Sequence, residues 1–160
     1  MGILSVICIV CFAGVSYAQD CDDIPELNRQ IVQIAHKYKS KKVGRGECWD
    51  LAQLILNETG AEWDGYEVYG RKINRKKECV YPGDIIQFEK VKLKYTEGNL
   101  TYTESMYHHT AIVKEVLSNN EVVLLHQNTA ATGRKVGESN LRFDTITKGE
   151  LFIYRPVPGN

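Results

Sequence analysis

The sequence predicts an α+β fold in which N-terminal helices pack on an antiparallel β-sheet of five or six strands. Between residues 23 and 58, apolar residues recur at the spacing of amphipathic helices. From residue 79 onward they alternate with polar residues at the period of two that is typical of strands. The helices come first and do not alternate with the strands, which favours an antiparallel sheet over a parallel one.

The first 18 of the 160 residues predict a cleaved signal peptide. They carry no charge and end in Ser16-Tyr17-Ala18, with small residues at the two positions that a signal peptidase reads. A membrane anchor is the alternative, but the apolar run is shorter than the ~20 residues that a spanning helix needs. We therefore expect residues 19–160 to form a single exported domain without membrane attachment, either secreted or, in a Gram-negative bacterium, periplasmic.

Two helices are predicted before residue 60. The first covers 23–38, where Pro25 occupies an early position at which a missing backbone donor has little cost. The second covers about 48–58, and Gly60 is placed to end it. Apolar residues on one side of each helix indicate that both pack against the sheet.

The strands begin after the turn Pro82-Gly83-Asp84. A first strand is expected at 85–88, and alternation out and back predicts a hairpin over 89–107. Further strands are expected at 109–116, 121–128 and 151–155. This gives the five or six strands of the predicted sheet.

Charge balance excludes one class of partner. The chain has 20 Lys plus Arg and 20 Asp plus Glu, so its formal net charge is zero. A nucleic-acid-binding domain or a polybasic membrane-binding patch would show an excess of positive charge. We therefore expect no nucleic acid partner, and we expect a monomer.

The cysteine count points to a reactive thiol. Cys8 and Cys11 leave with the signal, so the exported protein keeps Cys21, Cys48 and Cys79, and an odd number leaves at least one unpaired. Cys48 falls in the first turn of the second predicted helix, where the helix dipole lowers a thiol pKa from its free value of ~8.5. It is a candidate nucleophile, with a buried structural cysteine as the alternative.

Two predicted strands supply candidate partners for this thiol. His109 begins one strand, and alternation places it on the opposite face from His108. His126 and Asn128 are predicted to share a face at the end of the next strand. A Cys/His pair needs a third group that orients the imidazole, and either residue can accept that hydrogen bond.

Four short motifs resemble CHAP-type domains, relatives of the NlpC/P60 family in the papain-like cysteine peptidase group. In order they are GECWDLA at 46–52, PGDIIQF at 82–88, HTAIV at 109–113 and HQN at 126–128. The resemblance implies that Cys48 is the nucleophile and His109 the base. CHAP domains usually place Glu and then Asn where this chain has His126 and Asn128, whereas NlpC/P60 relatives commonly use His, so the third role stays open between the two.

The resemblance also implies an activity. Such domains hydrolyse amide or peptide bonds, most often in bacterial peptidoglycan, without a metal or other cofactor. A disulfide between Cys21 and Cys79 would keep Cys48 reduced by leaving it without a partner. The long hairpin is expected to form a wall of the cleft.

Two other classes of function compete with this one. A zinc site would use Cys48, His109 and His126 as ligands, but their spacing matches no common zinc pattern. The second is a catalytically altered papain-like scaffold that serves as a binding module, or a secreted toxin that acts on another amide substrate.

Overall fold

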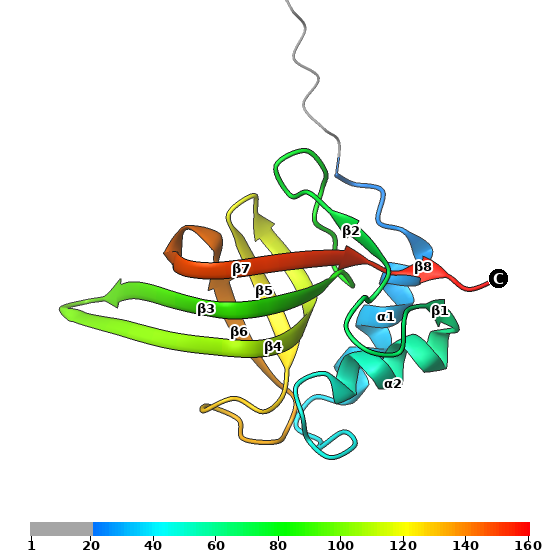
Figure 1. The fold of residues 1–160 in the computed structure, drawn as a ribbon, viewed down its shortest axis with the longest axis horizontal. Coiled ribbons are helices and arrows are strands. Elements are labelled where there is room, and N and C mark those ends of the chain that lie inside the picture. The colour runs from blue at the N-terminus through cyan, green and yellow to red at the C-terminus, as the bar shows by residue number, and fades with distance from the viewer. Residues whose placement is uncertain (1–20) are drawn as a thin grey trace, which may run out of the picture.

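The structure is a computed structural model that describes residues 21–160. The predicted signal peptide, with Cys8 and Cys11, lies outside the described residues. Two helices, α1 (Glu26–Lys37) and α2 (Asp50–Thr59), lie together at one end of a curved sheet (Figure 1). No helix within the described range is long and apolar enough to cross a membrane.

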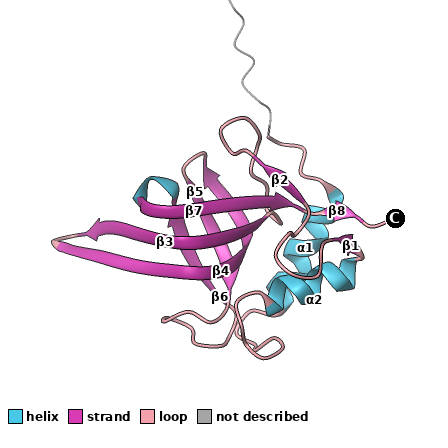
Figure 2. Cartoon of the chain, viewed as in Figure 1, coloured by secondary structure: helices cyan, strands magenta, loops and turns pink. Residues whose placement is uncertain are grey.

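The main sheet has six strands in the order β2-β7-β3-β4-β5-β6, and all of its pairings are antiparallel. This confirms the predicted α+β class and the number of strands (Figure 2). The strands are β2 (Arg71–Ile73), β3 (Ile85–Glu97), β4 (Leu100–Ser118), β5 (Glu121–His126), β6 (Gly137–Arg142) and β7 (Ile146–Arg155). Two short strands, β1 (Ala61–Glu62) and β8 (Val157–Pro158), pair separately, and a short 3-10 helix (Phe143–Thr145) precedes β7.

Several element boundaries differ from the prediction. The first helix begins at Glu26, because Pro25 is its N-cap with an extended backbone. The second begins at Asp50, so Cys48 lies in the turn before the helix and not in its first turn. Strand β6 was not expected, because its sequence, GESNLR, does not alternate apolar with polar residues.

The sheet buries both of its faces, and this decides where the two adjacent histidines point. On one face, Ile112 and Leu125 pack with the helices. On the other, Ala111 and Leu124 pack within the curve of the sheet. Because side chains alternate along a strand, His108 points to the helix side, while His109 points into the curve of the sheet.

An ion pair in the interior joins the end of β7 to the residue before β3, and α1 bonds to the same carboxylate. Arg155 donates to both carboxylate oxygens of Asp84, at 3.1 and 2.8 Å, and Asn28 of α1 donates to the same carboxylate at 2.9 Å. The predicted disulfide between Cys21 and Cys79 is present close by and leaves Cys48 as the free cysteine of the described chain.

The β3–β4 hairpin extends away from the helices (Figure 1). Its strands pair without a shift in register from Ile85↔Ile112 to Glu97↔Leu100. The pairing of β3 with β7 ends at Leu93↔Ile146. Beyond that point, β3 pairs only with β4 among the described strands. The expectation that the hairpin over 89–107 walls the cleft is wrong, because none of its residues lines the cavity at Cys48.

Candidate active site

The turn that carries Cys48 is held by the helix that follows it. Asp50 is buried, and one of its carboxylate oxygens accepts the backbone N–H of Arg45 at 2.7 Å and of Glu47 at 3.1 Å. Gly46 has a φ of +88°, and a Cβ there would come within 2.7 Å of the Arg134 side chain. Gly46 is therefore required for two reasons: a side chain there would collide with Arg134, and the backbone is left-handed.

Gln127 fixes the same turn to the sheet, and sequence reasoning missed it. Its amide oxygen accepts the backbone N–H of Val43 at 3.1 Å. Its amide nitrogen donates to the carbonyl of Val43 at 3.0 Å and to that of Glu47 at 2.7 Å. The side chain is fully buried, so three hydrogen bonds join the end of β5 to the residues just before Cys48.

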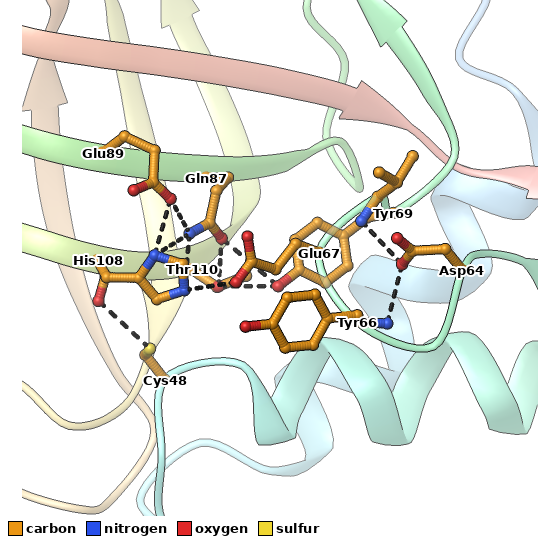
Figure 3. Close-up of polar contacts among 10 residues, drawn as sticks. Cys48, Asp64, Tyr66, Glu67, Tyr69, Gln87, Glu89, His108 and Thr110 are labelled. Atoms are coloured by element: carbon orange, nitrogen blue, oxygen red, sulfur yellow. Dashed lines mark hydrogen bonds and ion pairs between the residues drawn. The ribbon is translucent and has the colours of Figure 1, made fainter.

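Cys48 lies at an edge of β4 that no neighbouring strand covers. Strand β5 ends at His126, so residues 108–110 of β4 extend past it. The thiol lies 3.9 Å from the carbonyl oxygen of His108 (Figure 3). The backbone N–H of Thr110 also faces the sulfur and acts to lower the pKa of the thiol. Because these two groups flank His109 in the chain, the sulfur lies directly beside the backbone of His109.

Burial raises the pKa of the Cys48 thiol above its ordinary value. The N–H groups of Thr110, Trp49 and Cys48 itself oppose the shift, and the charge of Glu47 adds to it. The prediction of a lowered pKa is therefore wrong. Cys48 precedes the helix, and the loss of water around the half-buried sulfur outweighs the nearby backbone dipoles.

His109 and His126 form a buried pair, as their places on neighbouring strands predicted. Nε2 of His109 lies 2.9 Å from Nδ1 of His126, and the rings meet edge to face. Burial lowers the pKa of His109 to about 4, with a smaller effect of His108. Burial likewise lowers the pKa of His126 to about 3, and His109 adds to the shift. Both rings are therefore neutral near pH 7.

Asn128 does not share a face with His126, contrary to the prediction. The strand ends at His126, and Asn128 has a φ of +63° in the following turn. Its side-chain amide donates to a carboxylate oxygen of Glu47 at 3.0 Å, and it lines the cavity at Cys48. The structure therefore brings His126, and not Asn128, into contact with His109.

A cavity of about 440 Å³ opens at the thiol. Its wall opposite the turn carries His108, whose two ring nitrogens lie 2.8 Å from Glu89 and 3.1 Å from Glu67 (Figure 3). Tyr69 is buried beside them, and burial raises its pKa to about 12. The sequence offered no signal for Glu67, which comes from a loop without periodicity.

Two groupings have the residue types of a metal site. Ligand atoms of Glu67, Glu89 and His108 lie within 4.8 Å of one another, and their mutual ion pairs already account for that arrangement. The zinc alternative would require His109 and His126 to turn towards a common ion. Their facing nitrogens are instead in hydrogen-bond contact with each other.

A family comparison agrees with this architecture. Residues 25–160 match the family model described as the AIM3/BBC1 cysteine proteinase-fold domain. Among solved structures, the crystal structure of Ly7917 is 16% identical with a TM-score of 0.48, covering 79% of this chain and 62% of its own. The structure of Ly7917 with the hydrolyzing product of MDP is 18% identical with a TM-score of 0.48, covering 81% and 63%. No curated protein sequence matches.

Proposed function

Because this chain belongs to the family of AIM3/BBC1 cysteine proteinase-fold domains, we propose that it is a cysteine-dependent amidase. Cys48 is the nucleophile, His109 the general base and His126 the residue that orients His109. Two observations carry the proposal: the buried contact between the rings of His109 and His126, and the free thiol of Cys48, which lies against the backbone next to His109. Nε2 of His109 faces His126, so Nδ1 is the ring nitrogen left to receive the thiol proton.

The pKa directions decide how the first step proceeds. A raised pKa on Cys48 and a lowered pKa on His109 favour a neutral thiol and a neutral imidazole before substrate binds. Proton transfer to His109 therefore accompanies the attack of sulfur on the carbonyl carbon and does not precede it. The backbone N–H groups of Cys48 and Trp49, which lie beside the sulfur, are the donors available for the negative charge that develops on the carbonyl oxygen.

The cycle then closes without any other reagent than water. The protonated His109 gives its proton to the leaving amine as the C–N bond breaks, which leaves an acyl group on Cys48. Water attacks the thioester with His109 again as base, releases the acid and restores the thiol. His126 accepts the Nε2–H of His109 throughout and stabilises the imidazolium that forms.

We propose peptidoglycan amide or peptide bonds as the substrate, cut outside the cell by an exported monomer. The four motifs that resemble CHAP and NlpC/P60 domains support this substrate class. The uncharged N-terminal 18 residues support export. A non-catalytic binding module is the second candidate, and the raised pKa of Cys48 is the observation that favours it.

The test measures bond cleavage in two kinds of amide substrate. Protein lacking residues 1–18 is incubated with purified bacterial sacculi and, separately, with unfolded casein, and product masses identify the bond. We expect Cys48→Ala and His109→Gln to abolish cleavage. His36→Gln is the matched control, because it changes an exposed histidine of α1 that does not line the cavity and should keep wild-type turnover.

Two results would overturn the proposal. Cleavage that survives in Cys48→Ala would exclude the nucleophile, and the activity would belong to other residues. Folded wild-type protein that cleaves neither substrate, but binds sacculi, would support the binding module.

A further inference from the structure

The hydrogen-bonded chain at the active site does not end at His126. Nε2 of His126 lies 2.9 Å from the hydroxyl oxygen of Ser139, on the neighbouring strand β6. The register of β5 and β6 explains the contact. His126 pairs with Gly137 and Leu124 pairs with Ser139, so His126 and Ser139 are diagonal neighbours on the two strands. A line of three side chains thus runs from His109 through His126 to Ser139, each link 2.9 Å long.

We propose that Ser139 is a positioning residue that sets the tautomer of His126 and, through it, of His109. The inference rests on the proposed function, because it concerns the nitrogen that receives the thiol proton. A neutral imidazole carries one hydrogen, on one of its two nitrogens, and the other nitrogen is the acceptor. In a buried chain of two imidazoles, the tautomer of one therefore fixes the tautomer of the other.

Only one of the two arrangements leaves His109 able to act as a base. If His109 accepts the thiol proton at Nδ1, its own hydrogen is on Nε2 and is donated to Nδ1 of His126. His126 then carries its hydrogen on Nε2 and donates it to the oxygen of Ser139. In the reverse arrangement Ser139 donates to Nε2 of His126, and His126 donates from Nδ1 to Nε2 of His109. His109 then carries its hydrogen on Nδ1 and cannot accept the thiol proton there.

The surroundings of Ser139 leave room for the active arrangement. Its hydroxyl also borders a separate cavity of about 330 Å³, lined in part by Met106 and Leu141. The hydroxyl hydrogen can point into that cavity while a lone pair faces His126. Because His126 is buried, its Nε2–H would lack an acceptor without the serine, and an unpaired buried donor has a cost in free energy.

The test compares Ser139→Ala, which removes the acceptor, with Ser139→Thr, which keeps a hydroxyl. Amide hydrolysis should show kcat about five- to tenfold lower in Ser139→Ala with KM unchanged, in line with the loss of one hydrogen bond to a buried group. Ser139→Thr should restore most of kcat. Asn140→Ala is the matched control on the same strand, because Asn140 is exposed and its side chain bonds only Glu121 among the residues described, so both constants should stay unchanged.

Imidazole ¹⁵N chemical shifts provide a readout that does not require turnover. In wild type we expect both His109 and His126 to carry hydrogen on Nε2, and in Ser139→Ala a mixture of tautomers. Hydrogen on Nδ1 of His126 in wild type, or unchanged shifts and kcat in Ser139→Ala, would overturn the inference. If the expected tautomers are present but wild type cleaves no amide substrate, the proposed function fails and the tautomer assignment stands.

Discussion

Replacing Gln127 should loosen the turn that carries Cys48, and the structure sets the size of the effect. In Gln127→Leu, the N–H and carbonyl of Val43 and the carbonyl of Glu47 lose their partners. A buried polar group without a partner costs about 1–3 kcal/mol, and Val43 is buried. Partial access of water to Glu47 limits the sum, so we expect the free energy of unfolding to fall by about 2–5 kcal/mol.

A second variant at the same position separates hydrogen bonding from packing. Gln127→Glu keeps the size of the side chain but replaces the NH₂ group with an oxygen that faces two carbonyls. A buried carboxylate there is unfavourable, whereas the protonated acid can still donate one hydrogen bond. The deficit relative to wild type should therefore be larger at pH 7 than at pH 4.5.

Urea unfolding followed by fluorescence measures these differences, with wild type measured at each pH. Gln30→Leu is the matched control, because its amide contacts only Glu26 on the exposed surface of α1, and it should change stability by less than about 0.5 kcal/mol. A Gln127→Leu variant as stable as this control would refute the assignment of Gln127 as the link between β5 and the Cys48 turn.

Three further predictions concern the remainder of the fold. Replacing Cys21 and Cys79 by Ser removes a link across 58 residues and should lower the free energy of urea unfolding by about 4 kcal/mol; a loss below about 1 kcal/mol would contradict the chain-entropy estimate. Asp84→Asn leaves the guanidinium of Arg155, whose side chain is 13% exposed, without its carboxylate and should cost about 3–5 kcal/mol by the same assay, whereas near-wild-type stability would show that water replaces the pair. Because His109 and His126 have folded-state pKa values of about 4 and about 3, below the unfolded value of about 6.5, their neutral forms stabilise the fold. Tm from calorimetry should therefore fall as pH decreases from 6.5 towards 4, and a Tm that is constant over that interval would contradict this.

Sequence patterns predicted those features of the fold that depend on residues close together in the chain. The order of helices and strands and the adjacency of His109 and His126 followed from periodicity and strand alternation. The disulfide between Cys21 and Cys79 followed only after the family resemblance had assigned Cys48 as the nucleophile. Alternation also placed His108 and His109 on opposite faces correctly. Alternation did not predict the direction of Asn128, because the strand ends at His126 and Asn128 itself has a left-handed backbone conformation.

The features that were missed depend on contacts between distant segments. Gln127 reads as an ordinary polar residue at a strand end, but its partners lie 80 and 84 residues away. The pKa of Cys48 was predicted from its nearness to a helix start, and burial against β4 reversed the direction. Strand β6, which supplies Ser139, has no alternation of its own and exists through its pairing with β5.

In the outer part of the β3–β4 hairpin the two strands pair only with each other among the described strands, so the length of the hairpin can change without changing the geometry at Cys48. Residues added or removed near the tip, beyond Glu97, would leave His108 and His109 in place, since pairs at the base of the strands hold these two residues in register. The exposed turn at Gly98 and Asn99 is therefore a suitable point at which to graft a tag, a fluorophore or a surface linker. A protein immobilised there would keep its helices, which lie at the opposite end of the sheet from the hairpin tip, away from the support (Figure 1).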